Sequence, residues 1–88
     1  MIPVGVTEIS REEVKIWPNP VDKMLTVASS ETIETINVYT LNGTKKAIDT
    51  KSNKGIYQLD FSNSEAGTYL IEFQFAGKNS IVRKIVRI

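Results

Sequence analysis

The 88-residue chain contains neither cysteine nor histidine. Without cysteine it can form no disulfide, no thiolate nucleophile and no cysteine-ligated zinc site. Without histidine it lacks the usual general base and the commonest metal ligand, so a Ser-His-Asp triad is impossible within this chain. The remaining carboxylates follow no recognisable catalytic pattern. We therefore expect no enzymatic activity, no metal and no cofactor.

Long apolar runs and a strong charge imbalance are also absent. No stretch approaches the roughly 20 apolar residues that span a bilayer, so we expect no membrane span. The net charge of +1 gives no reason to expect nucleic acid or a membrane surface as a partner. Residues 1–13 lack the basic start and apolar stretch of a secretory signal. If the domain is exported, we expect its N-terminal signal elsewhere and Met1 to begin a fragment of a longer protein.

The charge is nevertheless uneven near the C-terminus. The last acidic residue is Glu72, and the basic residues that follow it are Lys78, Arg83, Lys84 and Arg87. One interpretation is a solvated strand face. The other is a basic surface that faces a partner.

The residues that are abundant predict an all-β fold. Short blocks rich in Val, Ile, Thr, Tyr and Phe alternate apolar with polar positions, and turn signals divide them about every ten residues. This pattern predicts a β-sandwich of six to seven short antiparallel strands, with a closed barrel as the alternative. The expected strands are residues 14–17, 24–29, 35–41, 45–49, 56–61, 68–75 and 80–88. Residues 1–13 are expected to be a linker or a weak first strand, and 50–55 a polar loop.

Several local features follow from the same pattern. The Asn42-Gly43 pair predicts a type I′ hairpin, because both residues tolerate positive φ. The segment SIVRKIVRI predicts a bulge near Arg83 and Lys84, because apolar pairs flank the two basic residues. The predicted core consists of Leu25, Val27, Ile36, Val38, Tyr57, Leu59, Tyr69, Ile71 and Phe73.

The segment WPNP, residues 17–20, places two prolines beside the first strand. Proline removes a ladder donor, so we expect this segment to pass over a sheet edge and resist pairing there. We expect the side chain of Asn19 to close a turn on local backbone. We expect Trp17 to cover the core rather than to form a ligand platform.

Four motifs in this order resemble the type A C-terminal sorting domain of the type IX secretion system of Bacteroidetes. The family pattern is aromatic-Pro-Asn-Pro with Leu-Thr, then Tyr-x-Leu-x-Gly, then Asp-hydrophobic-Ser leading to Gly-x-Tyr, then Gly-Lys and Lys-hydrophobic-Val. The matching residues are Trp17, Pro18, Asn19, Pro20, Leu25, Thr26, Val38, Tyr39, Leu41, Asn42, Gly43, Asp60, Phe61, Ser62, Gly67, Tyr69, Gly77, Lys78, Lys84, Ile85 and Val86. The chain departs from the family pattern at Ser64-Glu65, where the family usually has Leu-Pro, and in opening with Trp instead of Tyr or Phe.

The resemblance implies an immunoglobulin-like β-sandwich over residues 14–88, preceded by a linker at 1–13. It implies a non-catalytic signal that directs a cargo, attached on its N-terminal side, through the outer-membrane translocon to the cell surface or beyond. It also implies that a surface sortase then removes the domain. The expected partners are the translocon, the sortase and the cargo.

We expect the translocon to recognise the C-terminal strand, by strand addition or through an acidic groove. The residues assigned to this recognition are Lys84, Ile85, Val86, Arg87 and Ile88. The alternative function is an adhesive or carbohydrate-binding module appended to a secreted enzyme. That alternative requires an exposed aromatic platform, for which Trp17, Tyr39 and Tyr57 are the candidates.

Overall fold

The computed structural model describes residues 14–77 and 79–88, and within these ranges the chain forms strands and no helix. The linker assigned to residues 1–13 and the motif residue Lys78 lie outside the described residues. The eight strands are β1 (Val14–Trp17), β2 (Met24–Ser29), β3 (Ile33–Thr40), β4 (Lys45–Lys46), β5 (Asp49–Asn53), β6 (Ile56–Asp60), β7 (Gly67–Phe75) and β8 (Ile81–Arg87).

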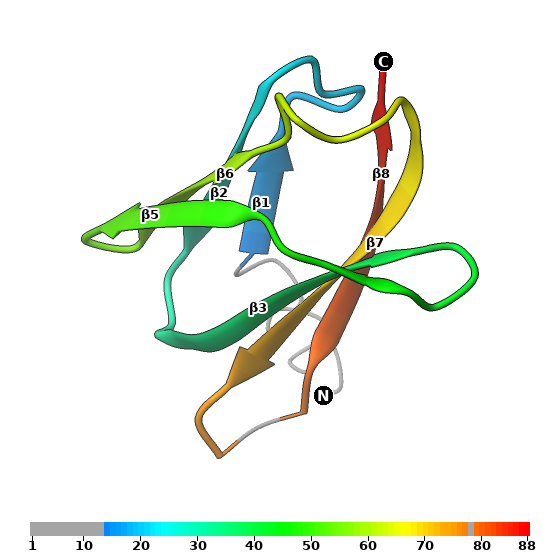
Figure 1. Cartoon of the computed structure of the whole chain (residues 1–88). Coiled ribbons are helices and arrows are strands. Elements are labelled where there is room, and N and C mark those ends of the chain that lie inside the picture. Colours follow the sequence, from blue (N-terminus) through cyan, green and yellow to red (C-terminus); the bar gives the residue numbers. More distant parts are fainter. Residues whose placement is uncertain (1–13, 78) are drawn as a thin grey trace, which may run out of the picture.

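The strands form two four-stranded antiparallel sheets that face each other (Figure 1). One sheet has the order β1-β2-β6-β5 and the other has the order β4-β3-β7-β8. These orders correspond to the ABED and C′CFG sheets of the immunoglobulin fold. The predicted immunoglobulin-like sandwich is therefore confirmed, with eight strands instead of six to seven.

A single hydrophobic core lies between the sheets. In β7 the residues at alternate positions, from Tyr69 to Phe75, are buried, as the period of two in a strand requires. Leu25, Val27 and Leu59 meet them from the other sheet and are fully buried. Each such aliphatic or aromatic side chain stabilises the fold by about 1.5–3 kcal/mol. All nine predicted core residues belong to this cluster, with Ile36 and Tyr57 only partly buried. The core also contains Val14, Val21, Ile33, Phe61, Phe75 and Ile85.

The segment after β3 differs from its prediction. The strand expected at 45–49 is present only at its first two residues, as β4, and the polar loop expected at 50–55 is wrong because β5 begins at Asp49. The short strand β4 pairs with β3, and the chain then crosses to the other sheet, where β5 pairs with β6. All five residues of β5, an edge strand with the sequence DTKSN, are polar and exposed. Such a strand has no apolar face, and the hydrophobic pattern therefore carries no sign of it.

The type I′ hairpin also lies elsewhere. It joins β5 to β6, where Lys54 and Gly55 have φ angles of 52° and 84°. A Cβ on Gly55 would lie 3.0 Å from the carbonyl oxygen of Ser29. At the predicted site only Gly43 has a positive φ, of 92°. There the N–H of Thr40 donates to the carbonyl of Thr44 at 2.8 Å, which leaves a hairpin loop of residues 41–43, one residue too long for type I′.

Strand β8 carries no bulge, so that prediction is wrong. Its register against β7 runs unbroken from Ile81 opposite Phe73 to Arg87 opposite Gly67. The irregularity in this sheet falls instead in β3, between Ile33 and Thr35. An unbroken β8 places its odd-numbered residues toward the other sheet and its even-numbered residues outward. The apolar pairs of SIVRKIVRI therefore divide between the two faces.

Candidate functional site

The five residues assigned to translocon recognition divide between the two faces of β8 and its end. Ile85 is fully buried in the core, and the Arg87 side chain is only 15% exposed. Lys84 is exposed and faces outward, together with Val86 and Ile88, which are 39% and 63% exposed. The folded domain therefore offers three of the five side chains to a partner.

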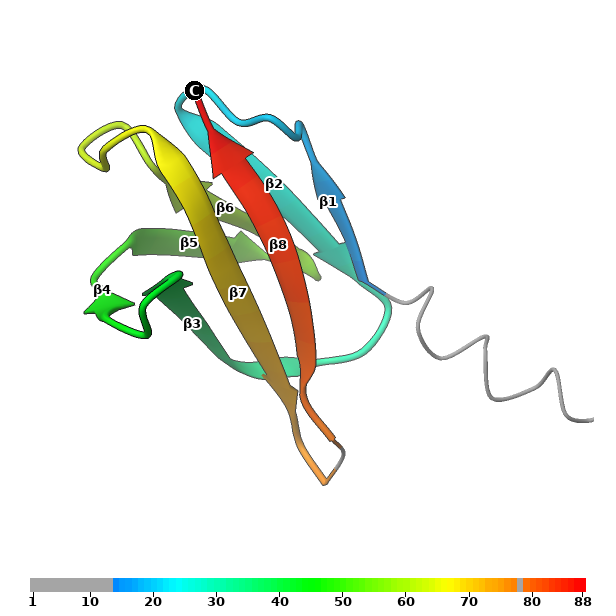
Figure 2. The same cartoon turned by 90° about the vertical axis from the view of Figure 1, so that its right-hand side faces the viewer.

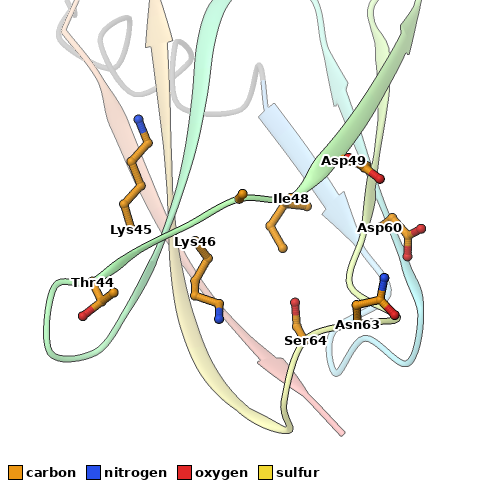
Figure 3. A pocket seen from close by; sticks show the side chains of 9 residues that line it. Thr44, Lys45, Lys46, Ile48, Asp49, Asp60, Asn63 and Ser64 are labelled. Atoms are coloured by element: carbon orange, nitrogen blue, oxygen red, sulfur yellow. The ribbon is translucent and has the colours of Figure 1, made fainter.

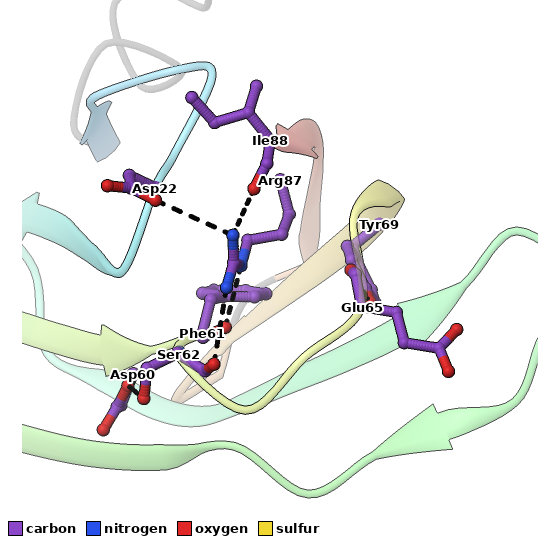
Figure 4. A network of polar contacts seen from close by, with 8 residues as sticks. All are labelled: Asp22, Asp60, Phe61, Ser62, Glu65, Tyr69, Arg87 and Ile88. Carbon is purple, nitrogen blue, oxygen red and sulfur yellow. Dashed lines mark hydrogen bonds and ion pairs between the residues drawn. The ribbon is translucent and has the colours of Figure 1, made fainter.

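Arg87 holds the loop after β6 against the C-terminal end of β8 (Figure 4). Its Nε donates to the carbonyl of Phe61 at 2.9 Å, and its Nη2 donates to the carbonyl of Ser62 at 3.4 Å. Its Nη1 donates to the carbonyl of Ile88 and lies 3.8 Å from Oδ1 of Asp22. Arg87 therefore connects the loop between β1 and β2, the loop after β6 and the last strand.

The WPNP segment reaches the free edge of the same strand. Oδ1 of Asn19 accepts from the N–H of Val86 at 3.0 Å, and Nδ2 of Asn19 donates to the carbonyl of Lys84 at 3.4 Å. The side chain of Asn19 thus bonds to β8, not to local backbone as the sequence suggested. Both prolyl peptide bonds of the segment, Trp17-Pro18 and Asn19-Pro20, are cis.

Val21 continues this contact with its backbone. Its N–H donates to the carbonyl of Val86 at 2.7 Å, and its carbonyl accepts from the N–H of Ile88 at 3.0 Å, which makes a parallel bridge to β8. Its side chain is fully buried. Figure 2 shows the loop between β1 and β2 reaching the C-terminal end of β8. We call Asn19 and Val21 with these four hydrogen bonds the edge clasp.

Sequence reasoning missed Val21 and Asp22 as partners of the C-terminal strand. The available signal was one apolar residue directly after Pro20, in a segment otherwise polar or proline-rich. Trp17 was also misplaced: it lies across from Thr26 and is 47% exposed, so it does not cover the core. Trp17 lies on the same exposed face of β1 as Lys15, two residues earlier, whereas Val14 is buried.

The loop motif after β6 is held by local hydrogen bonds and by one ring contact. Oδ1 of Asp60 accepts from the hydroxyl of Ser62 at 2.6 Å and from its N–H at 2.8 Å. These two bonds, the hydroxyl bond first, lower the pKa of Asp60 below its ordinary value of 3.8, and the charge of Lys51 adds to the effect. Phe61 is fully buried and meets the ring of Tyr69 edge to face, with centroids 5.6 Å apart.

Tyr69 forms a tyrosine corner. Its hydroxyl donates to the carbonyl of Glu65 at 2.6 Å, across the loop that joins β6 in one sheet to β7 in the other. This is the geometry of the corresponding tyrosine in immunoglobulin domains. Gly67, two residues earlier, has a φ of 148°. The Gly-x-Tyr motif therefore fixes a crossing between the sheets despite the departure at Ser64-Glu65.

The middle motif and the last glycine occupy turns. Oδ1 of Asn42 accepts from the hydroxyl of Thr44 at 3.2 Å and from its N–H at 3.4 Å. It also accepts from the hydroxyl of Thr40. Gly77, with a φ of 70°, lies in the loop between β7 and β8. Within the part of the chain that the structure describes, the motif residues hence lie in turns, in the corner, in the core and in the edge clasp.

A polar groove of about 340 Å³ lies between the crossing from β4 to β5 and the loop after β6 (Figure 3). Its two carboxylates belong to Asp49 and Asp60, which lie opposite each other in the register of β5 and β6. Over residues 14–77 and 79–88 there is no group of three or more His, Cys, Asp or Glu side chains that could hold a metal ion. The groove's other lining residues are Thr44, Lys45, Lys46, Ala47, Ile48, Asn63 and Ser64.

These features define a class of protein: a small immunoglobulin-like β-sandwich whose motif residues build its turns and close its last strand. The family follows from comparison with known proteins. The family model described as "Secretion system C-terminal sorting domain" matches residues 15–88. The chain belongs to this family, the C-terminal sorting domains of type IX secretion, as its motifs indicated. The search of curated proteins finds no match.

Membership in this family indicates the general function of the domain. The domain is a sorting signal of a secretion system, and its family is generally non-catalytic. It implies interaction with secretion machinery and an attached cargo, and export to the cell surface or the extracellular space. Within the described ranges, no helix has the length and apolar character of a transmembrane span.

Proposed function

We propose that residues 14–88 direct a cargo, attached on their N-terminal side, through the outer-membrane translocon, and that a surface sortase then removes the domain. Residues 1–13 serve in this proposal as the linker at which the sortase cuts. The observation that carries the proposal is the family match over residues 15–88, which includes both the WPNP segment and the C-terminal strand.

The edge clasp supports the idea that the folded domain is the signal. Asn19 and the carbonyl of Lys84 are 65 residues apart in sequence and in contact in the fold. The first and last family motifs are therefore adjacent only when the sandwich has formed. We assign recognition to the C-terminal strand, Lys84 to Ile88, as the sequence suggested.

The aromatic residues do not support the alternative of a carbohydrate-binding module. Trp17 lies on the outer face of the β1-β2-β6-β5 sheet, and Tyr39 belongs to the other sheet. Tyr57 is partly buried against the core, and its hydroxyl accepts from the N–H of Ile33 at 3.4 Å. These three rings form no common exposed platform, which that function requires.

The test is a fusion of the whole 88-residue chain to the C-terminus of a periplasmic reporter. It is expressed in a type IX-competent bacterium and in an isogenic translocon mutant. We expect surface or extracellular reporter only in the competent strain, with the domain missing from the exported product. Export in both strains, or in neither, would contradict the proposal. Export with the domain retained would contradict sortase removal alone.

A further inference from the structure

The outward face of β8 is unusually apolar for an edge strand. Val82 is 54% exposed, Val86 39% and Ile88 63%, and all three lie at alternate positions on the side away from the core. Edge strands are commonly protected by charged residues, and exposed apolar side chains that gather beside polar ones are typical of an interaction site. Lys84 is the one charged residue in this row.

The edge of the strand is less accessible than its face. On the side away from β7, the carbonyl of Lys84, both backbone groups of Val86 and the N–H of Ile88 are bonded to Asn19 and Val21 in the edge clasp. A partner strand could pair with β8 over these residues only if the clasp opened. The side chains of the outward row remain free to contact a partner while the clasp is closed.

The outward row continues across the sheet. Lys84 lies opposite Leu70, Leu70 opposite Tyr39, and Tyr39 opposite Lys45. This line has an apolar centre and a lysine at each end. The acid beside it, Glu72, lies opposite Val82 and accepts from Nδ2 of Asn37 at 3.2 Å. We call Tyr39, Lys45, Leu70, Val82, Lys84 and Val86 the outer β7–β8 face.

We propose that the outer β7–β8 face is the surface with which the domain docks on its secretion machinery. Its partner is a protein surface that combines apolar side chains with carboxylates placed against Lys84 and Lys45. This inference rests on the proposed sorting function and specifies the surface through which the domain carries it out. Ile85 and Arg87 hold β8 in place from the inner side, and Lys84 and Val86 make the contact.

The test uses the same reporter fusion with substitutions on this face. Lys84→Glu and Val86→Ser are each expected to reduce surface reporter by about tenfold or more, as for the central residues of an interface. Lys84→Arg should retain export, and Lys84→Ala should lose less than Lys84→Glu, because glutamate repels the partner's carboxylates. The matched controls lie on the other sheet: Lys15→Glu, and Ile56→Ser, whose side chain is 41% exposed. Both controls should export normally.

A second pair of variants distinguishes face docking from strand addition. The N–H groups of Val86 and Ile88 point to the free edge, so the N–H of Val82 points there too. Val82→Pro removes this edge donor and leaves the bonds to β7 intact. Val82→Ser removes only the apolar side chain. We expect both variants to lose export equally.

The outcomes separate the two proposals. If Val82→Pro loses export and Val82→Ser does not, the domain is recognised by strand addition, and docking through the outer β7–β8 face is overturned. Normal export of both Lys84→Glu and Val86→Ser, or equal loss in the controls, would also overturn it while the sorting function stands. Failure of the unmodified fusion would count against the sorting function itself. Thermal unfolding of each purified variant, followed by circular dichroism, verifies that any loss occurs in a folded domain.

Discussion

At the scale of single residues, the family's motifs work mostly by hydrogen bonding. Asn19 is the clearest case, because one side chain supplies both a donor and an acceptor to β8, as a neighbouring strand would. An amide does this where the adjacent prolines have no N–H to offer. The sequence shows an amide side chain between two prolines, but it does not show that this side chain bonds to the distant strand β8.

We expect Asn19→Ala to lower the free energy of unfolding by about 1–2 kcal/mol, because it removes one well-formed hydrogen bond and one longer one. Denaturant unfolding followed by tryptophan fluorescence measures the change. Asn63→Ala, at an exposed loop position, is the control and should stay within about 0.5 kcal/mol. Equal effects at the two positions would mean that the Asn19 side chain adds no stability through its part of the clasp.

Tyr69 and Tyr39 allow a matched comparison of two hydroxyl groups. Tyr69→Phe removes the bond to the carbonyl of Glu65 and should cost about 1 kcal/mol. The hydroxyl of Tyr39 has no hydrogen bond within residues 14–77 and 79–88, so Tyr39→Phe should cost little. The same denaturant titration measures both variants. A smaller loss for Tyr69→Phe than for Tyr39→Phe would contradict the assigned role of the corner.

At the scale of elements, prediction from sequence succeeded where a strand has one buried face. β7 alternates cleanly, because its Tyr69, Ile71, Phe73 and Phe75 all enter the core. It failed for β5, which is exposed throughout. The prediction also failed for β8. Apolar residues occupy both faces of this strand, and the resulting sequence pattern resembles that of a strand with a bulge. The outward row belongs to the proposed docking surface, so the residues that misled the sequence prediction are those to which we assign the function.

We expect substitutions on the inner face of β8 to lower stability and substitutions on its outer face to lower export. Arg87→Ala removes the charged donor to the carbonyls of Phe61 and Ser62, and we expect a loss of about 1.5–3 kcal/mol in the free energy of unfolding. Lys84→Ala should leave that quantity within about 0.5 kcal/mol and lower export. Unfolding curves and surface-reporter assays on both variants make the comparison. A stable Arg87→Ala domain would show that the loop after β6 needs no such anchor.

At the scale of the whole molecule, the C-terminal residues complete the fold as well as carrying the proposed signal. The loop between β1 and β2, the loop after β6 and the end of β8 meet around Arg87 and the edge clasp. These contacts join residues from both ends of the described chain. They can therefore form only when the sandwich has folded. A small domain of this length has a total stability near the low end of 5–15 kcal/mol.

Deletion of residues 84–88 should therefore unfold the domain, as well as abolish export. The deletion removes the fully buried Ile85, whose loss alone costs about 2–5 kcal/mol, together with Arg87 and every β8 partner of the clasp. These losses together approach the whole stability of the domain. Circular dichroism and proteolysis of the purified deletion variant should show no cooperative unfolding. A folded deletion variant that is not exported would instead assign residues 84–88 to recognition alone. Only the outward substitutions, which leave Ile85 and Arg87 in place, can test recognition in an intact sandwich.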